Sequence, residues 1–152
     1  AEVVAASGAG LVLMHMRGTP GDMDERTDYR DLVGEVVGEL GRALERARAG
    51  GVEAERIVVD PGFGFAKTGQ QNLVLLRRLS ELAALGRPVM VGPSRKRFLG
   101  EVLGVPPRER DVGTAAACAL AYLGGARIFR VHDVRPAAHA LAVAHAMTTA
   151  RS

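Results

Sequence analysis

Short apolar runs alternate along the chain with longer segments in which apolar residues recur at helical spacing. Glycine, proline or charged residues bound each short run, and such runs are typical of strands buried on both faces of a parallel sheet. The pattern therefore predicts four buried parallel strands, at Leu11–Met14, Ile57–Val59, Val89–Val91 and Ile128–Val131.

The longer segments predict amphipathic helices between these strands. Apolar residues from Leu32 to Ala47 form one broad stripe, and Gly50-Gly51 supplies a stop signal. Further helices are expected at residues 73–83 with a stop at Gly86, at residues 112–123, and after Asp133, whose carboxylate suits an N-cap.

The strand ends recur about every 39 residues, which is the spacing of strand–loop–helix units. Four such units make an α/β protein, either an open doubly wound sheet or half of an eight-unit barrel, and periodicity does not distinguish the two. In both architectures the chemistry is expected at the carboxyl ends of the strands.

Composition is that of one globular domain. The chain has 152 residues, 47% of them hydrophobic and 24% charged, and its apolar runs are too short to span a membrane. A single cysteine, Cys118, excludes an internal disulfide, favours a cytoplasmic location and is expected to fill a small space in the core.

The charge distribution favours a small anionic ligand over nucleic acid. The net charge is +3, and the segment from Arg87 to Arg110 alone carries +4. A nucleic-acid interface would need a broad basic stripe with stacking aromatics, and aromatic residues make up only 4% of the chain.

The first two predicted strand ends carry candidate ligand-binding residues. Alternation places Met14 and Met16 on one face of the strand and His15 on the other. One interpretation makes the methionines core residues and has the backbone satisfy the hydrogen bonds of His15. The other makes the methionines an apolar floor for a flat ligand. Asp60 is either a turn cap or a carboxylate that accepts paired N–H donors from a planar amino-heterocycle. The glycines and phenylalanines after it suit close backbone approach and apolar walls.

The other two strand ends carry basic residues. Lys96 is one of only two lysines in a chain with 18 arginines. The use of lysine here favours a site that requires a compact ammonium group, and the alternative is a solvated basic turn. Arg130 and His132 share one face of the last predicted strand and suit an anion-binding edge, with a structural Arg–Asp pair as the alternative. The sequence contains no Cys/His metal cluster and no assignable Ser-His-Asp arrangement.

Four motifs together resemble the dihydropteroate synthases, a family of pterin-binding enzymes, in the same order and at similar spacing. They are Leu13-Met14-His15-Met16, Asp60-Pro61-Gly62-Phe63-Gly64-Phe65, Ser94-Arg95-Lys96 and Arg130-Val131-His132-Asp133-Val134. The resemblance implies that the protein folds as a TIM barrel, acts in folate biosynthesis and is a target of sulfonamides. The implied reaction joins 6-hydroxymethyl-7,8-dihydropterin diphosphate to 4-aminobenzoate and releases pyrophosphate with Mg²⁺.

The resemblance also implies roles for individual residues. Asp60 would hold the amino and ring N–H groups of the pterin, and Met14 would touch the pterin, while Gly64 would let the backbone approach. Lys96 would reach the pterin carbonyl and border the aminobenzoate pocket. Arg130 would stack on the pterin and, with His132, hold the departing diphosphate. Phe65 and the loop Ser94–Arg97 would flank aminobenzoate, although Arg97 stands where some members carry serine.

The resemblance is confined to the C-terminal half of the family's barrel. Residues 1–152 would form units five to eight, and Ala1–Ala6 reads as the end of a helix that stops at Gly8. The absent N-terminal half would carry the main Mg²⁺ ligand and further pterin contacts, so we expect little activity from this chain alone. The full-length protein would be a homodimer. The alternatives are a pterin-binding methyltransferase domain and a non-catalytic half-barrel.

Overall fold

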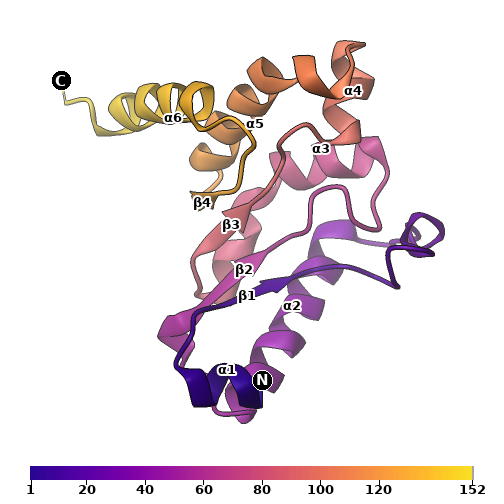
Figure 1. Ribbon diagram of the computed structural model, residues 1–152, viewed down its shortest axis with the longest axis vertical. Coiled ribbons are helices and arrows are strands. Elements are labelled where there is room, and N and C mark those ends of the chain that lie inside the picture. Colours follow the sequence, from indigo (N-terminus) through magenta and orange to yellow (C-terminus); the bar gives the residue numbers. More distant parts are fainter. Residues whose placement is uncertain (152) are drawn as a thin grey trace.

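Four parallel strands form the centre of the computed structural model, which describes residues 1–151 (Figure 1). They are β1 (Leu11–Met14), β2 (Ile57–Asp60), β3 (Val89–Val91) and β4 (Ala126–Phe129). The strands pair in the order β1-β2-β3-β4, and Leu11 lies opposite Ile57 in the β1–β2 register. All four strands therefore end at the same edge of the sheet.

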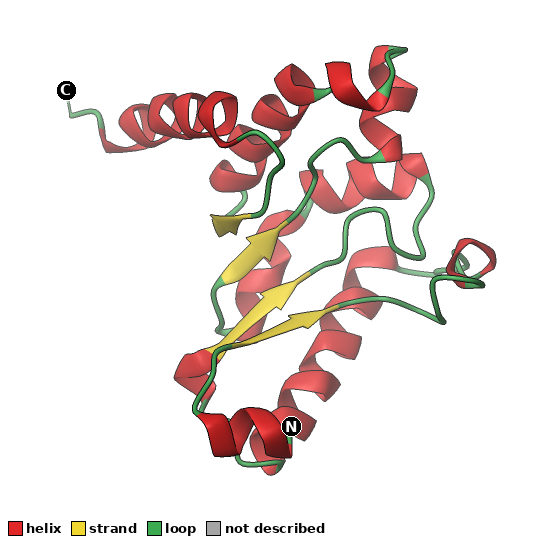
Figure 2. Ribbon diagram, in the orientation of Figure 1, coloured by secondary structure: helices red, strands yellow, loops and turns green. Residues whose placement is uncertain are grey.

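The helices alternate with the strands (Figure 2). They are α1 (Glu2–Ser7), α2 (Leu32–Ala49), α3 (Gly69–Arg77), α4 (Arg97–Leu103), α5 (Asp111–Leu123) and α6 (Val134–Thr149). Short 3₁₀ helices lie at Met23–Glu25, Ala54–Arg56, Leu79–Leu85 and Pro107–Glu109. The helices expected near α2, α5 and α6 are confirmed, and so is the stop of α1 at Gly8, which has a φ of 67°.

The strand order decides between the two architectures that the sequence left open. A doubly wound sheet interleaves its strands and carries helices on both faces, whereas a barrel keeps each strand beside its neighbour in the chain. Here the order is sequential, and Leu13 and Val59 face a core shared with α2. In the view of Figure 1, α2 lies behind the strands. The arrangement is that of neighbouring units in a barrel.

The expectation that every strand is buried on both faces is wrong for β1 and β4. Val12 on β1 is 46% exposed, and Met14 and Ile128 are exposed as well. The helices cover only one face of the sheet, and β1 and β4 are its edge strands with a neighbouring strand on one side only, so part of each strand meets no second packing layer. Cys118, in contrast, is fully buried in α5, as expected.

The fourth strand begins and ends two residues earlier than expected. Gly124 and Gly125 close the turn after α5, Gly125 with a φ of 99°, and the strand starts directly afterwards at Ala126. Arg130 therefore follows the strand, held by a 2.9 Å bond from its backbone N–H to the carbonyl of Val91. Its side chain is 61% exposed, so the cost of burying an arginine within a strand does not arise.

The second expected helix is divided and longer than its apolar stripe. It begins at Gly69 because Thr68 and Gln71 form a capping box, in which each side chain bonds the other residue's backbone N–H. After Arg77 the chain tightens into the 3₁₀ helix Leu79–Leu85, which ends at Gly86 as expected. Helix α4, which begins at Arg97, was not expected.

Replacing the cap of α3 should destabilise the protein measurably. Thr68→Ala removes one half of the capping box, and we expect it to lower the free energy of unfolding by about 1 kcal/mol, measured by urea denaturation. Thr148→Ala is the matched control, because Thr148 is exposed and bonds only within its own helix, and its effect should stay within about 0.5 kcal/mol. Equal effects of the two variants would contradict a stabilising role of the cap.

Candidate active site

The structure places every predicted site residue at or just after the carboxyl end of a strand. Met14 ends β1 and Asp60 ends β2. Gly64 and Phe65 follow β2. Ser94, Lys96 and Arg97 follow β3, and Arg130 and His132 follow β4. Because parallel strands end at one edge of the sheet, residues up to 118 positions apart in the sequence are brought into one region.

Asp60 is the buried centre of this region. Its carboxylate is nearly inaccessible to water, so burial raises the pKa of Asp60 above its usual value. One oxygen, Oδ1, accepts the backbone N–H of Gly62 at 2.8 Å, and Oδ2 lies 3.8 Å from a guanidinium nitrogen of Arg130. The Arg–Asp pair expected as an alternative to an anion site is therefore present, but on an exposed arginine.

Three cations surround this one carboxylate. The charges of Arg130, Lys67 and Lys96 each act to lower the pKa of Asp60 and so oppose the effect of burial. One negative charge facing Arg130, Lys96 and the partly protonated Lys67 leaves a positive local field, which favours a ligand that carries negative charge. The same carboxylate still offers acceptor positions to N–H donors of that ligand.

Gly64 allows Lys96 to lie against the loop that follows β2. A Cβ at Gly64 would sit 2.8 Å from the side-chain Cδ of Lys96, and the glycine has a φ of 75°. The ammonium of Lys96 lies 3.9 Å from the centre of the Phe65 ring, a cation–π contact. Burial lowers the pKa of Lys96, and the neighbouring guanidinium of Arg130 lowers it further.

Phe63 takes a different place from the one expected for it. It was expected to line the site together with Phe65, but it is almost fully buried and stacks on Phe98 of α4 at a centroid distance of 5.9 Å. Phe63 therefore anchors the β2 loop to the core, and only Phe65 remains beside Lys96.

Ser94 and His132 join the loops that follow β3 and β4. The backbone N–H of His132 donates to Ser94 Oγ at 3.1 Å, and the same Oγ lies 2.9 Å from His132 Nδ1. The Ser94 hydroxyl donates its proton to Nδ1 when the ring proton of His132 is on Nε2, and accepts from Nδ1–H in the other tautomer. We expect the first arrangement, which uses the hydroxyl proton and leaves Nε2–H as a donor.

An arginine–aspartate pair holds the turn that carries Lys96. Arg95 has a φ of 58°, unusual for a residue with a side chain, and its guanidinium makes two bonds to Asp111, of 2.9 and 2.7 Å. Arg110 adds a bond of 3.1 Å to the carbonyl of Arg95. The side chain of Arg95 is thereby turned away from the ligand region, while Lys96 faces it.

Arg97 borders the site without contacting its other charged residues. Its side chain is 66% exposed and lies 3.3 Å from Glu101 within α4. It lines a cavity of about 170 Å³ together with Gly64, Lys96 and Phe98. This cavity is similar in size to the engineered cavity of about 150 Å³ that binds benzene.

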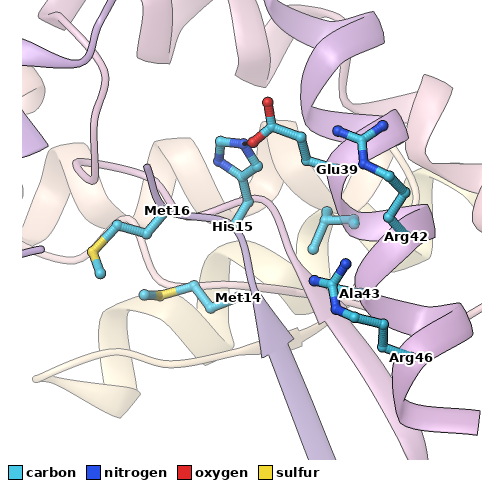
Figure 3. Close-up of a pocket in the computed structure, with 8 residues that line it drawn as sticks. Met14, His15, Met16, Glu39, Arg42, Ala43 and Arg46 are labelled. Carbon is cyan, nitrogen blue, oxygen red and sulfur yellow. Dashed lines mark hydrogen bonds and ion pairs between the residues drawn. The ribbon is translucent and has the colours of Figure 1, made fainter. Parts of the chain in front are cut away.

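A larger cavity of about 290 Å³ lies at the free edge of β1, and it contains only one predicted site residue, Met14 (Figure 3). Figure 3 shows Met14 and Met16 pointing away from α2, whereas His15 points toward Glu39 on that helix, as the predicted alternation requires. The cavity lined by Lys96 is the better candidate, because it adjoins the charged cluster around Asp60.

Sequence reasoning assigned no role to two buried polar residues of this region, Asn72 and Lys67, and it misjudged the partners of a third, His15. Asn72 accepts the N–H of Gly64 at 2.8 Å through its side-chain oxygen. His15 is satisfied by side chains and not by the backbone, since Nε2 lies 3.0 Å from Glu39 and Nδ1 lies 3.0 Å from Lys67. The sequence did offer one indication for Lys67, which is that it is one of only two lysines in the chain.

Residues 1–132 match the family model described as pterin binding enzyme. The chain belongs to this family. Its motifs lie where the family resemblance placed them, at the ends of four parallel strands.

Two curated relatives in the pterin-binding family are dihydropteroate synthases. That of Synechocystis sp. is 50% identical over 146 residues, which cover 95% of this chain and 50% of the relative. That of Mycobacterium leprae is 47% identical over 150 residues, covering 94% and 53% of the two chains. The chain thus spans about half the length of these relatives.

Solved structures of dihydropteroate synthases superpose closely on this fold. The Yersinia pestis enzyme with a sulfonamide drug has a TM-score of 0.95 at 38% identity, with 98% of this chain and 54% of that chain covered. The Thermus thermophilus enzyme in complex with 6HMPPP has a TM-score of 0.91 at 46% identity, covering 97% and 59%. These synthases are TIM barrels, so the expected half of an eight-unit barrel is confirmed.

The described part of this pterin-binding chain does not fit a metal site. Within residues 1–151, no group of three or more His, Cys, Asp or Glu side chains is arranged to hold a metal ion. The Mg²⁺ implied by the resemblance stays a prediction. Over the same residues, no helix has the length and apolarity that a membrane crossing requires.

The tautomer of His132 should depend on Ser94. In the wild type, neutral His132 should carry its proton on Nε2, read from the imidazole ¹⁵N chemical shifts, with His132→Gln used to assign the signals. Ser94→Ala removes the donor to Nδ1, so a mixture of both tautomers is expected. Ser7→Ala, at an exposed serine on α1, should leave the shifts unchanged. A wild-type signal from the Nδ1–H form would contradict the assignment.

Proposed function

We propose that this chain is the half of a dihydropteroate synthase that binds the pterin and the diphosphate. The full reaction joins 6-hydroxymethyl-7,8-dihydropterin diphosphate to 4-aminobenzoate in folate biosynthesis. The single observation that carries this proposal is the buried Asp60 carboxylate with Arg130 and Lys96 beside it, at the ends of three adjacent strands.

The buried carboxylate suits the pterin ring. Asp60 is held by Gly62 N–H on one oxygen, and its remaining acceptor positions are directed to paired N–H donors, such as the amino and ring N–H groups of a pterin. Lys96 is a donor of the kind that a ring carbonyl accepts, and Met14 offers an apolar contact at the end of β1. Donor and acceptor groups thus match a flat, polar heterocycle.

The basic residues after β4 suit the diphosphate. The exposed guanidinium of Arg130 and the Nε2–H of His132 are both donors, and they follow the same strand. As the bond between the methylene carbon and the diphosphate oxygen breaks, negative charge develops on the leaving group, and fixed donors stabilise it. Lys96, Arg130 and His132 are the catalytic residues in this scheme.

The second substrate completes the reaction by attack on the same carbon. The lone pair of the aminobenzoate nitrogen forms a C–N bond to the pterin methylene, the C–O bond to diphosphate breaks, and the nitrogen loses a proton. The cavity lined by Lys96, Gly64 and Arg97 supplies a space of suitable size for the aromatic ring. Phe65 and Ser94 flank this region in the proposal. The protein supplies no nucleophile.

A dihydropteroate synthase accounts for the basic cluster better than a pterin-binding methyltransferase does. Transfer of a methyl group from a folate releases no diphosphate. It therefore gives no reason for Arg130 and His132 to lie together past Asp60, the carboxylate that would hold the pterin. The relatives described above are also synthases. A homodimer of the full-length protein and a cytoplasmic location are further parts of this proposal.

Replacing Asp60 should weaken pterin binding strongly. Asp60→Asn keeps the shape of the side chain but presents an amide donor to the ring N–H groups, so we expect the Kd for the pterin diphosphate to rise roughly tenfold to a hundredfold. Isothermal titration calorimetry measures the change. Asp28→Asn, at an exposed position, is the matched control and should bind like the wild type. Unchanged affinity in Asp60→Asn would remove the main support for the proposal.

The 152-residue chain should show little or no turnover by itself. It spans about half the length of its relatives, and a site assembled from eight strand ends is then incomplete. The measurement is product formation from the pterin diphosphate, 4-aminobenzoate and Mg²⁺ with purified chain. Substantial product formation would show that these residues suffice for catalysis, whereas pterin binding without product separates a binding half from an inert one.

A further inference from the structure

Lys67 is a buried ammonium group for which the proposed reaction has no role. It lies in the loop between β2 and α3 and is 2% exposed. Lysine is among the residues least often fully buried, because its charge loses the stabilisation by water. A lysine in such a position requires specific partners.

The partners of Lys67 use all three of its N–H donors. Its Nζ lies 3.2 Å from the carbonyl oxygen of Gly62, 3.0 Å from that of Phe65, and 3.0 Å from Nδ1 of His15. An ammonium has three donors and no acceptor, so the protonated form matches these three acceptors one to one. A neutral amine has only two N–H donors and leaves one acceptor without its bond.

Two of these bonds fasten the loop that shapes the candidate pterin pocket. Gly62 donates to Asp60, and Gly64 and Phe65 contact Lys96, so the carbonyls of Gly62 and Phe65 belong to the part of the loop that lies against the site. Phe65 N–H also bonds Gly62 O at 3.1 Å, which closes a tight turn around the ammonium. Lys67 thus lies inside this turn and binds both of its ends.

The third bond connects the loop to β1 and α2. Since Nδ1 of His15 accepts from Lys67, its Nε2–H donates to Glu39, and Glu39 is bonded in turn by Nε of Arg17 at 3.0 Å. Burial and the charge of Lys67 lower the pKa of His15 to about 4, so His15 is a neutral acceptor at pH 7. The loop is therefore held by a continuous polar chain from β2 to α2.

We propose that Lys67 is a positioning residue that holds the Gly62–Phe65 loop in the conformation that binds the pterin. The inference rests on the proposed function for the identity of the ligand. The loop-holding role itself depends only on the geometry around Nζ and can be tested without any ligand.

Burial and the positive charge of Arg17 lower the pKa of Lys67 to about 7, while Asp60 and Glu39 oppose this change. These groups and neutral His15 are the charged and titratable groups that face the amine from β1, β2 and α2. The ammonium is consequently lost near neutral pH, and the neutral amine keeps two N–H donors for the carbonyls of Gly62 and Phe65. Opening of the loop would return the amine to water and raise its pKa toward 10.5, so the closed loop gains stability as the pH rises above about 7.

The first experiment measures amide hydrogen exchange in the loop without ligand. In the wild-type chain, the protection factors of the Gly64 and Phe65 amides should rise as the pH rises from 7 to 8.5, because the open loop holds the proton of Lys67 more tightly than the closed loop does. In Lys67→Met they should be lower by about tenfold at pH 6 and independent of pH over that range. Arg78→Met is the matched control, since it changes an arginine outside this loop whose partners are Glu81 and Asp31.

The pH dependence of global stability should have the same sign. The pKa of Lys67 is about 7 in the folded state and near its ordinary value of 10.5 in the unfolded state, so the unfolded chain binds more protons between these values. The part of the unfolding free energy that depends on Lys67 should therefore rise from about pH 7 to about pH 10.5. Urea denaturation of wild type and Lys67→Met measures the unfolding free energy of each over this pH range, and the difference between the two gives the part that depends on Lys67.

The second experiment measures binding of the pterin diphosphate by calorimetry. Lys67→Met should raise the Kd about tenfold at pH 6. Wild-type protection that does not change with pH, together with unchanged exchange in Lys67→Met, would overturn the role of Lys67. Absence of pterin binding by the wild-type chain would instead contradict the proposed function, and the exchange data would still decide the role of Lys67. The wild-type pH series needs no variant, so a poorly folding Lys67→Met would not prevent the test.

Discussion

The buried charge of Asp60 is the constraint on which the rest of the candidate site depends. A carboxylate removed from water is costly unless hydrogen bonds and opposite charges compensate it. Here Gly62 N–H bonds one oxygen, and the cations of Lys67, Lys96 and Arg130 approach from the loops after β2, β3 and β4. The requirement to compensate one charge thus draws three loops together, and the same cations leave a positive field for an anionic ligand.

Hydrogen bonds within the protein brace the loops that carry these groups, and these bonds form without a ligand. Ser94 bonds His132, Arg95 bonds Asp111, and Asn72 bonds Gly64, so each loop after β2, β3 and β4 is attached to another element. This bracing offsets local backbone strain: Ala66 and Arg95 have φ values of 50° and 58°, conformations that cost of the order of 1 kcal/mol each. Preorganised donors of this kind are what stabilisation of a leaving group requires.

Sequence reasoning found the residues that end strands and missed those that act from within the fold. Asp60 was identified because a charged residue directly after an apolar run is visible in one dimension, Lys96 because lysine is rare in this chain, and Arg130 because it shares one face of an apolar run with His132. Lys67 and His15 were not paired, because 52 positions separate them and only the packing of the β2 loop against β1 brings them together. Phe63 was expected at the site, since nothing in the alternation distinguishes it from Phe65, and its stacking on Phe98 depends on a helix that was not expected.

By itself the sequence determined the four strand–helix units, their parallel arrangement and the set of chemical groups at their ends, because apolar periodicity and the residues that interrupt it are local properties. Only the tertiary structure decided that the strands lie in chain order with helices on one face, that β4 ends before Arg130, and that Lys67 is enclosed by the loop it holds. These features depend on which surfaces pack together and on the three-dimensional balance of buried charge, and neither is encoded in the spacing of residues along the chain.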